Sequence, residues 1–255
     1  MKWDKKLEEY ILKLREDGYT YDRIAKEIES TPTAVKHKVR RIKQSQNDDR
    51  YKHTKEKFSQ FRNCLCNFNL PIKPRILETH CGFGGMTEHY ANIGEVESYD
   101  IKKERASFVN NRFDNSIGIH ADSEIEIYRL VANKRKYDII DIDPYGLPSR
   151  YFPHVFSLIN DGILFLTFPV MGVAQINKIT IRHYQAFWNI ELSDKPAYLN
   201  KIKNKLEDFA FQHKRSVNFL DTIKIGRIYR IAMRVKRKSL CDIVGLIVKK
   251  QKQLP

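Results

Sequence analysis

The stretch RILETHCGFGG, residues 75–85, joins a short apolar run to a turn rich in glycine. The run RILET has the aliphatic character of a buried strand and carries an acid, Glu78, near its end. Gly82, Gly84 and Gly85 then open a segment with helical periodicity. Glycines in a strand-to-helix turn let the backbone approach a bound ligand closely. The stretch therefore predicts a nucleotide-cofactor turn, although the third glycine of the G-x-G-x-x-G pattern is absent after Gly84.

Apolar runs continue to alternate with helical segments on the carboxyl side of this stretch. Further apolar runs lie at 95–99, 116–120, 137–143 and 162–168, and segments of helical periodicity lie at 85–93, 102–112, 123–133 and 149–160. The alternation predicts an α/β fold in which helices cover both faces of a parallel sheet. SVNFLDTIKI and RIYRIAMRVK, joined around Gly226, predict an antiparallel hairpin that closes the sheet.

Two more acids follow the next strands at the predicted sheet edge. Asp100 ends the second run, where a carboxylate would hold ribose hydroxyls, and Asp122 follows the third run, where it could meet an adenine amine. The carboxyl ends of parallel strands share one edge, and such sheets bind ligands there. Each acid alone could equally cap a helix, but three acids in this order indicate a binding crevice.

Taken together, residues 70–240 resemble the class I S-adenosylmethionine-dependent methyltransferases. Glu78, Gly82, Gly84, Asp100 and Asp122 match the cofactor motifs of that family one by one. The resemblance implies a Rossmann-like methyltransferase sheet and S-adenosyl-L-methionine as the cofactor. The cofactor-binding residues that it implies are Glu78, Cys81, Gly82, Gly84, Asp100, Ile101 and Asp122. Cys81 is a less common residue before the glycines, and no specific role follows for it.

The fourth run, YDIIDIDPYG at residues 137–146, is where this family places its chemistry. An exocyclic amine of a base is a weak nucleophile because its lone pair conjugates with the ring. Asp143 and the carbonyl of Pro144 could accept its hydrogens and free the lone pair, while Tyr145 offers a ring for stacking. We therefore expect these three residues to be catalytic, against the alternative of an ordinary β-turn. Asp141 shares a strand face with Asp143 and would lie behind it.

DIDPYG resembles motif IV of the amino-directed nucleic-acid methyltransferases, in which Asp, Asn or Ser is usually followed by Pro-Pro and an aromatic residue. It lacks the second proline and is similar to the D-P-F/Y-G form of the tRNA guanine-N2 dimethyltransferases. Those enzymes differ at the glycine turn, have a longer C-terminal region and lack the N-terminal helices predicted here. The resemblance implies transfer to an exocyclic amine, while guanine, adenine and cytosine all stay open as the base.

The first fifty residues predict three short helices. One apolar stripe runs through WDKKLEEYILKL and ends at Asp17-Gly18, and a second stripe covers residues 21–29. Thr31 can then cap a third helix, residues 33–43, with Pro32 at its first position. The polar face of this third helix carries Thr33, Lys36, His37, Arg40 and Arg41.

GYTYDRIAKEIESTPTAVKHKVRRI resembles the Myb-like or resolvase-type helix-turn-helix of many phage and archaeal proteins. In that motif the last helix meets base edges in a major groove. The resemblance implies that the five polar-face residues bind nucleic acid, and it makes a phage or viral origin one expectation. A three-helix protein-docking module is the alternative. The expected domains are 1–45 (helix-turn-helix), 46–69 (linker or helical connector), 70–240 (methyltransferase) and 241–255 (basic tail).

The charge distribution favours a polyanionic partner. The net charge is +15, and residues 200–255 alone hold 15 Lys or Arg against 4 Asp or Glu. Clustered positive charge attracts nucleic acid through counterion release, and a solubility role is the alternative. The basic residues of the last predicted strand that could contact phosphates are Arg227, Arg230, Arg234 and Lys236.

Other features bound the protein class. No apolar run approaches the roughly 20 residues that a membrane span needs, and the charged start MKWDKKLEEY lacks a signal-peptide core. We expect a soluble cytoplasmic protein that contacts no membrane. The four cysteines are expected to be reduced, and the single C-x-C pair predicts no metal site.

Three functions follow from these features. The leading one is methyl transfer to an exocyclic amine in DNA, with the helix-turn-helix holding the duplex while a base is extruded. The second is an RNA methyltransferase similar to the guanine-N2 group. The third is a DNA-binding regulator whose cofactor domain has lost activity, which the intact Asp143-Pro144-Tyr145 disfavours. The recognition sequence, the number of methyl groups added and the oligomeric state stay open.

Overall fold

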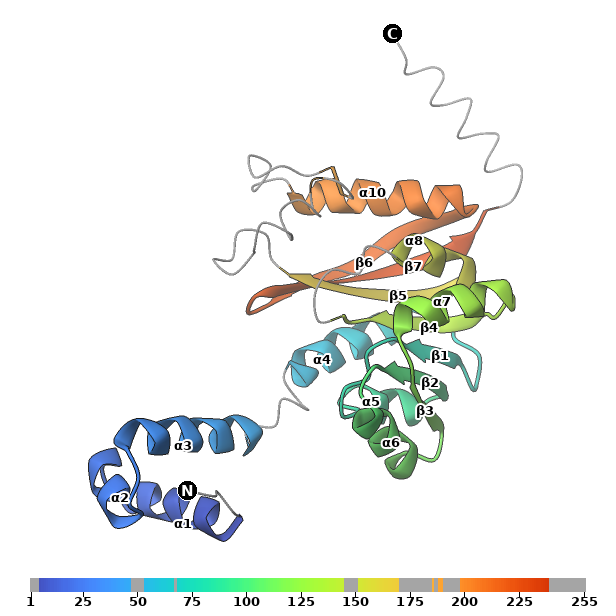
Figure 1. The fold of residues 1–255 in the computed structure, drawn as a ribbon. Helices are drawn as coiled ribbons and strands as arrows, with labels where there is room; N and C mark the ends of the chain where they lie inside the picture. The colour runs from blue at the N-terminus through green and yellow to red at the C-terminus, as the bar shows by residue number, and fades with distance from the viewer. Residues whose placement is uncertain are drawn as a thin grey trace. The chain divides into compact units, whose positions relative to one another are not determined.

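The computed structural model describes residues 5–46, 53–66, 68–144, 151–169, 185, 188–189 and 198–238 (Figure 1). The side chains of residues 5, 6, 16 and 40–46 are not among those described. The chain divides into two compact units, Met1–Lys52 and His53–Pro255.

The first unit contains the three expected helices, α1 (Lys5–Glu16), α2 (Tyr21–Glu27) and α3 (Pro32–Gln46). α1 ends just before Gly18, whose φ of 87° suits glycine. Thr31 caps α3 as expected, since its Oγ1 accepts a hydrogen bond of 3.1 Å from the Ala34 amide. The unit has a core of its own, built from all three helices, which includes Ile11, Leu14, Ile24, Ala25, Val35 and Val39.

The second unit is built on a sheet that has seven strands within the described residues. The strands are β1 (Arg75–Glu78), β2 (Glu95–Asp100), β3 (Ser116–His120), β4 (Tyr137–Ile142), β5 (Ile159–Pro169), β6 (Arg215–Ile225) and β7 (Ile228–Arg237). Their order is β3-β2-β1-β4-β5-β7-β6. β1 to β5 are parallel, whereas β7 is antiparallel to both β5 and β6. The predicted α/β class and closing hairpin are thus confirmed.

Helices cover both faces of this sheet. They are α4 (Thr54–Leu65), α5 (Thr87–Ala91), α6 (Lys103–Arg112), α7 (Ser123–Ala132), α8 (Phe152–Val155), the 3-10 helix η2 (Phe156–Leu158) and α10 (Tyr198–Gln212). One core lies between the sheet and α7, α8 and α10, and a second lies between the sheet and α4 and α5. The central strand β4 is therefore buried on both faces, as a parallel strand requires.

α4 lies in the region expected to be a linker or connector, residues 46–69, and it packs against β6 and β7 in the second unit. Its buried residues recur every three or four positions, which is a helical spacing, but most of them are polar: Thr54, Lys57, Gln60, Phe61 and Cys64. The start of this helix therefore carries no apolar periodicity in the sequence. The division after Lys52 falls within this expected connector.

The predicted helix at 149–160 differs from the structure at its C-terminal end. α8 stops at Val155, η2 follows, and β5 already begins at Ile159. Ile159 pairs with Tyr137 at the start of β4, so the sheet extends the strand into a segment with helical periodicity. None of the helices among the described residues has the length and apolar character of a membrane span.

Candidate active site

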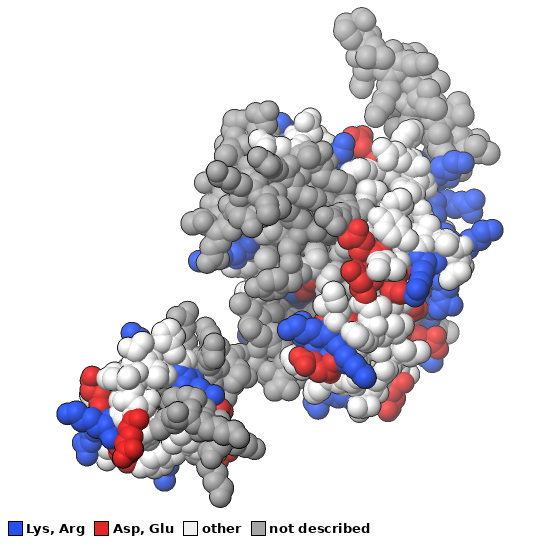
Figure 2. All heavy atoms as spheres, in the orientation of Figure 1, with Lys and Arg blue, Asp and Glu red and all other residues white. Residues whose placement is uncertain are grey.

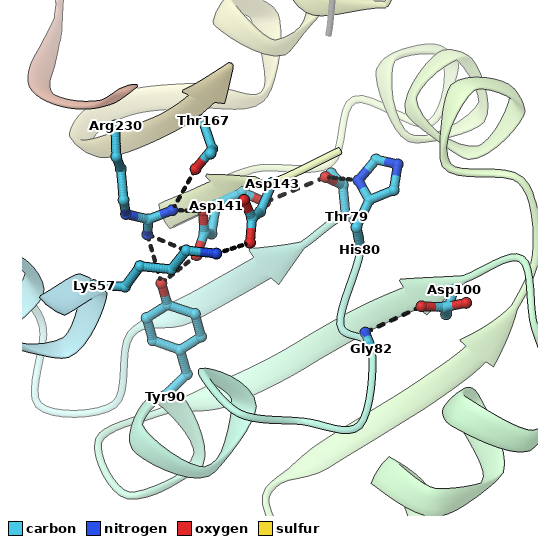
Figure 3. A network of polar contacts seen from close by, with 10 residues as sticks. All are labelled: Lys57, Thr79, His80, Gly82, Tyr90, Asp100, Asp141, Asp143, Thr167 and Arg230. Atoms are coloured by element: carbon cyan, nitrogen blue, oxygen red, sulfur yellow. Dashed lines mark hydrogen bonds and ion pairs between the residues drawn. The ribbon is translucent and has the colours of Figure 1, made fainter. Parts of the chain in front are cut away.

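The candidate site lies where the carboxyl ends of β1, β2 and β4 meet. β1 has β2 on one side and β4 on the other, so the chain order reverses at this point of the sheet. Open α/β sheets bind ligands at such a switch point. Glu78, Asp100 and Asp143 come from the ends of β1, β2 and β4, and Figure 3 shows Asp143, Asp100 and the intervening Gly82.

The glycine turn between β1 and α5 is shaped by two positive φ angles. Gly84 has a φ of 78°, and a Cβ there would lie 2.6 Å from the Phe113 ring, so both conformation and packing require glycine. Gly82 has a φ of 56°, and no described atom lies within 4 Å of the place where its Cβ would be. Its amide donates a 3.0 Å hydrogen bond to Asp100 Oδ2. The turn is thus tied to β2 and leaves space for a ligand beside Gly82.

Asp100 is buried at the end of β2. Oδ1 accepts a 2.8 Å hydrogen bond from the Lys102 amide, and Oδ2 lies 3.6 Å from the Arg105 guanidinium in addition to its bond from Gly82. A carboxylate has about four acceptor sites, so Oδ1 retains capacity for a ligand hydroxyl. Ile101 follows with 69% of its surface exposed, which gives an apolar surface next to the acid.

Glu78 is buried beneath the turn and joins three elements. Its Oε2 accepts hydrogen bonds from the hydroxyls of Thr87 at 2.5 Å and Ser98 at 3.0 Å. Burial raises the pKa of Glu78 to about 7, and the nearby Asp141 and Asp143 act in the same direction, while the two hydroxyls oppose the rise. Glu78 therefore holds a proton to higher pH than an exposed glutamate does.

Asp122 and Cys81 differ in how the structure uses them. Asp122 is exposed and caps α7, since its Oδ1 accepts a 2.8 Å hydrogen bond from the Glu124 amide. The capping alternative is thus observed, and a contact with an adenine amine stays a prediction. Cys81 is buried in the turn, and burial raises the pKa of its thiol, which keeps the thiol neutral.

Asp143 follows the last residue of β4 and is paired with a lysine. Lys57 Nζ, from α4, contacts Asp143 Oδ2 (Figure 3). The Lys57 side chain is 9% exposed, whereas that of Asp143 is 25% exposed. Burial alone would raise the pKa of Asp143, but the Lys57 ammonium and then the Arg230 guanidinium hold it below its ordinary value. Asp143 is therefore a carboxylate at neutral pH.

Asp141 lies behind Asp143, as expected, and is bound by a buried arginine. Arg230 NH1 and NH2 each donate a 2.8 Å hydrogen bond to one oxygen of Asp141, and the Tyr90 hydroxyl donates a 2.6 Å bond to Oδ2. NH1 also bonds Thr167 Oγ1 at 3.0 Å. The expectation that Arg230 contacts phosphates is wrong, because its side chain is fully buried and faces Asp141.

His80 is a further residue of the site that the sequence did not point to. Its Nδ1 lies 2.8 Å from Thr79 Oγ1. Its ring is stacked with that of Tyr151, which precedes α8, and the two ring centroids are 6.3 Å apart. Burial lowers the pKa of His80, although the surrounding carboxylates, Asp143 first, oppose this. His80 is therefore neutral at physiological pH and can form a hydrogen bond with a ligand through Nε2.

The remaining predicted residues are only partly within the described chain. Pro144 follows Asp143 and is half-buried, whereas Tyr145 lies outside the described residues. In the first unit, Thr33, Lys36 and His37 are exposed on α3 as expected. The side chains of Arg40 and Arg41 lie outside the described set, although their backbone belongs to α3.

No protein-family model matches the sequence. The chain is 30% identical over 101 residues to the tRNA (guanine(26)-N(2))-dimethyltransferase of Methanococcus aeolicus, a match that covers 38% of this chain and 26% of that protein. It is 27% identical over 108 residues to tRNA (guanine(26)-N(2))-dimethyltransferase 2 of Arabidopsis thaliana, covering 38% of this chain and 18% of that protein. The chain thus matches about a quarter or less of these relatives.

A solved structure with a similar fold is Trm1 from Pyrococcus horikoshii, in complex with S-adenosyl-L-methionine. The TM-score is 0.51 at 15% sequence identity, and the match covers 65% of this chain and 51% of that chain. At 15% sequence identity, the structural similarity establishes a shared fold. Together with the strand order, it shows that the second unit has the Rossmann-like α/β fold of the S-adenosylmethionine-dependent methyltransferases.

Proposed function

We propose that this protein transfers a methyl group from S-adenosyl-L-methionine to an exocyclic amine of a base in RNA, with guanine N2 of a tRNA-like substrate as the leading target. The observation that carries the proposal is a charged, partly exposed Asp143 at the end of β4, beside the glycine turn. The matched relatives are named as tRNA guanine-N2 dimethyltransferases, which favours the RNA alternative over the DNA function expected first.

The described residues fit the cofactor that the fold implies. Asp100 would accept the ribose hydroxyls, Ile101 would cover the adenine, and the open backbone at Gly82 would lie against the rest of the molecule. Glu78 would support the turn from below through Thr87 and Ser98. When bound, S-adenosyl-L-methionine supplies an electrophilic methyl group on sulfur.

Asp143 would then act on the acceptor base. Its carboxylate would accept a hydrogen bond from the exocyclic N–H, draw the nitrogen toward tetrahedral geometry and stabilise the positive charge that develops there. The Pro144 carbonyl would serve as a second acceptor, and proline fixes the chain direction at this point. Tyr145 would stack on the base, as the sequence predicts.

Basic surfaces would hold the nucleic acid. The first unit presents Lys36 and His37 on α3, next to the predicted base-contacting Thr33. In the second unit, Figure 2 shows Lys and Arg side chains gathered on the side where β7 ends. Exposed Lys214, Lys236 and Arg237 belong to this region, since β6 begins beside the end of β7. These residues lie at the amino ends of the parallel strands, whereas Asp143 follows the carboxyl end of β4. Because they are far from the acceptor base, their contacts would be with phosphates.

Nucleoside mass spectrometry tests the proposal directly. The full chain is incubated with methyl-labelled S-adenosyl-L-methionine and either unmodified tRNA or DNA. Label should appear as N2-methylated guanosine in tRNA and should fall by about 10²- to 10⁴-fold with the Asp143→Asn variant. Asp161→Asn, which changes an exposed acid on β5, is the matched control and should remain active. Label in DNA alone would favour the first expectation, and label in neither would refute a methyltransferase of nucleic acid.

A further inference from the structure

Lys57 is a buried lysine whose ammonium group touches the proposed catalytic acid. It stands on α4, the polar helix that precedes β1, and only 7% of its surface is exposed. Its Nζ contacts Asp143 Oδ2 across a separation of 86 residues in the sequence. α4 therefore supplies one residue directly to the candidate site, although most of its buried face packs on the sheet.

Burial of this lysine is not explained by stability alone. Removing a cation and a carboxylate from water costs several kcal/mol for each ion, and an apolar residue at such a position is often as stable or more stable. The neighbouring Asp141 already has Arg230, whose two terminal nitrogens both bind it. The ion pair of Lys57 is thus with Asp143 and not with Asp141. The proposed role of Asp143 in catalysis therefore gives a reason for the buried position of Lys57.

The groups around Asp143 come from β1, β4, β5 and β7, from α4, and from the two segments that carry His80 and Tyr151. The acids Glu78 of β1 and Asp141 of β4 favour the protonated form of Asp143, and the guanidinium of Arg230 on β7 favours the charged form. His80 and Tyr151 face it as neutral groups, and the Thr167 hydroxyl of β5 favours its charged form. Among the described side chains, Lys57 is the cation in direct contact with the Asp143 carboxylate.

We propose that Lys57 is a positioning residue for the amine methylation: it holds Asp143 by Oδ2 from the protein interior and keeps the carboxylate charged, so that the exposed part of the carboxylate can accept the amine N–H. The inference rests on the proposed function. It follows from the contrast in exposure, because Lys57 approaches from the buried side while Asp143 retains a solvent-facing side.

Replacing Lys57 should change the pH dependence of catalysis. In Lys57→Met, burial and the two nearby acids act on Asp143 against the Arg230 guanidinium but without the ammonium, so its pKa rises by about 1 to 3 pH units, the range typical for loss of an adjacent opposite charge. A protonated Asp143 presents a hydroxyl where the amine needs an acceptor. The acidic limb of kcat/KM for tRNA should therefore move to higher pH by that amount, and activity should recover at alkaline pH.

The experiment compares wild type, Lys57→Met, Lys57→Gln, Lys57→Arg and Lys55→Met. Lys55 is exposed on the same helix, so Lys55→Met removes the same charge away from the site and should leave the pH profile unchanged. Lys57→Arg should restore most of the wild-type profile. Lys57→Gln keeps a polar group and provides a second neutral variant if methionine impairs folding, which circular dichroism and cofactor binding would reveal.

A second readout separates this inference from the proposed function. The pKa of the Asp143 carboxyl is measured by 13C NMR, with the signal assigned by its loss in Asp143→Asn. A higher pKa in both neutral variants supports the assigned role of Lys57 even if the chosen RNA is a poor substrate. An unchanged pKa together with an unchanged kcat/KM profile would overturn it. If the pKa moves while wild type methylates no nucleic acid, the proposed function fails and Lys57 merely maintains the charge of Asp143.

Discussion

Replacing Glu78 by glutamine should remove a specific part of the pH dependence of stability. The pKa of Glu78 rises from an ordinary value of 4.5 to about 7 in the folded protein, so the folded state holds its proton more tightly than the unfolded chain does. The stability that follows from this is fully present below about pH 4.5 and is lost as the pH rises through about 7. One pH unit of pKa difference corresponds to about 1.4 kcal/mol, which gives a loss of about 3 kcal/mol across the window.

Glutamine cannot titrate, yet it keeps a carbonyl oxygen that can accept the hydrogen bonds of Thr87 and Ser98. The free energy of unfolding of Glu78→Gln relative to wild type should therefore rise by about 3 kcal/mol between pH 4.5 and pH 8. Denaturant titrations at several pH values measure this difference. Trp188, which is buried in the second unit, reports the transition by fluorescence in a Trp3→Phe background.

Glu97→Gln is the matched control for this prediction. Glu97 lies on β2, and although burial acts to raise its pKa, hydrogen bonds from Tyr137, Tyr99 and Arg135 hold the pKa below its ordinary value. Its contribution to stability is present above about pH 4.5 and is lost only as the pH falls further, so its difference from wild type should stay flat over the tested window. A flat difference for Glu78→Gln as well would refute the reasoning about the buried acid.

Asp143→Asn should lower methyl transfer by about 10²- to 10⁴-fold, the usual effect of losing a positioned acid–base group, while calorimetry shows unchanged cofactor affinity; substantial residual activity would contradict the assigned role. Removal of residues 1–52 should weaken nucleic-acid binding and reduce its salt dependence without changing cofactor affinity, and identical binding isotherms would exclude the first unit as an anchor. Arg230→Met should destabilise the protein by about 3 to 5 kcal/mol because it leaves Asp141 buried without its cation. Arg234→Met, which breaks a partly exposed pair with Asp161, should cost less than about 1 kcal/mol, and equal effects of the two variants in denaturant titrations would argue against this difference.

The sheet could be predicted from the sequence because short runs with apolar residues alternate with segments of helical periodicity. The acids at the ends of β1, β2 and β4 could be located for the same reason, since a strand end is visible in the sequence even where the partner strand is not. Asp122 shows the limit of this approach: an acid after a strand is also the residue that caps the next helix, and the structure shows the cap.

The partners of the acids could not be predicted. Lys57 contacts Asp143 from 86 residues away and Arg230 contacts Asp141 from 89 residues away, and no local spacing marks either contact. Both also sit in misleading surroundings. Lys57 lies in a polar segment that has no apolar stripe, and Arg230 lies in a strand whose other cations suggest a phosphate-binding face. Pairing of buried opposite charges is a property of the assembled fold. In the sequence, the one sign of it is Asp141, an acid within an apolar run that has no assigned role.

The ion pair between Asp141 on β4 and Arg230 also constrains the order in which the protein can fold. Arg230 stands on the last strand of the sheet, so a polypeptide still emerging from the ribosome carries Asp141 without the guanidinium that neutralises it. Until β7 is synthesised and docked, packing of β4 would trap an uncompensated negative charge. A chain that ends before Ile228 would therefore lack the guanidinium that neutralises Asp141 in the folded protein.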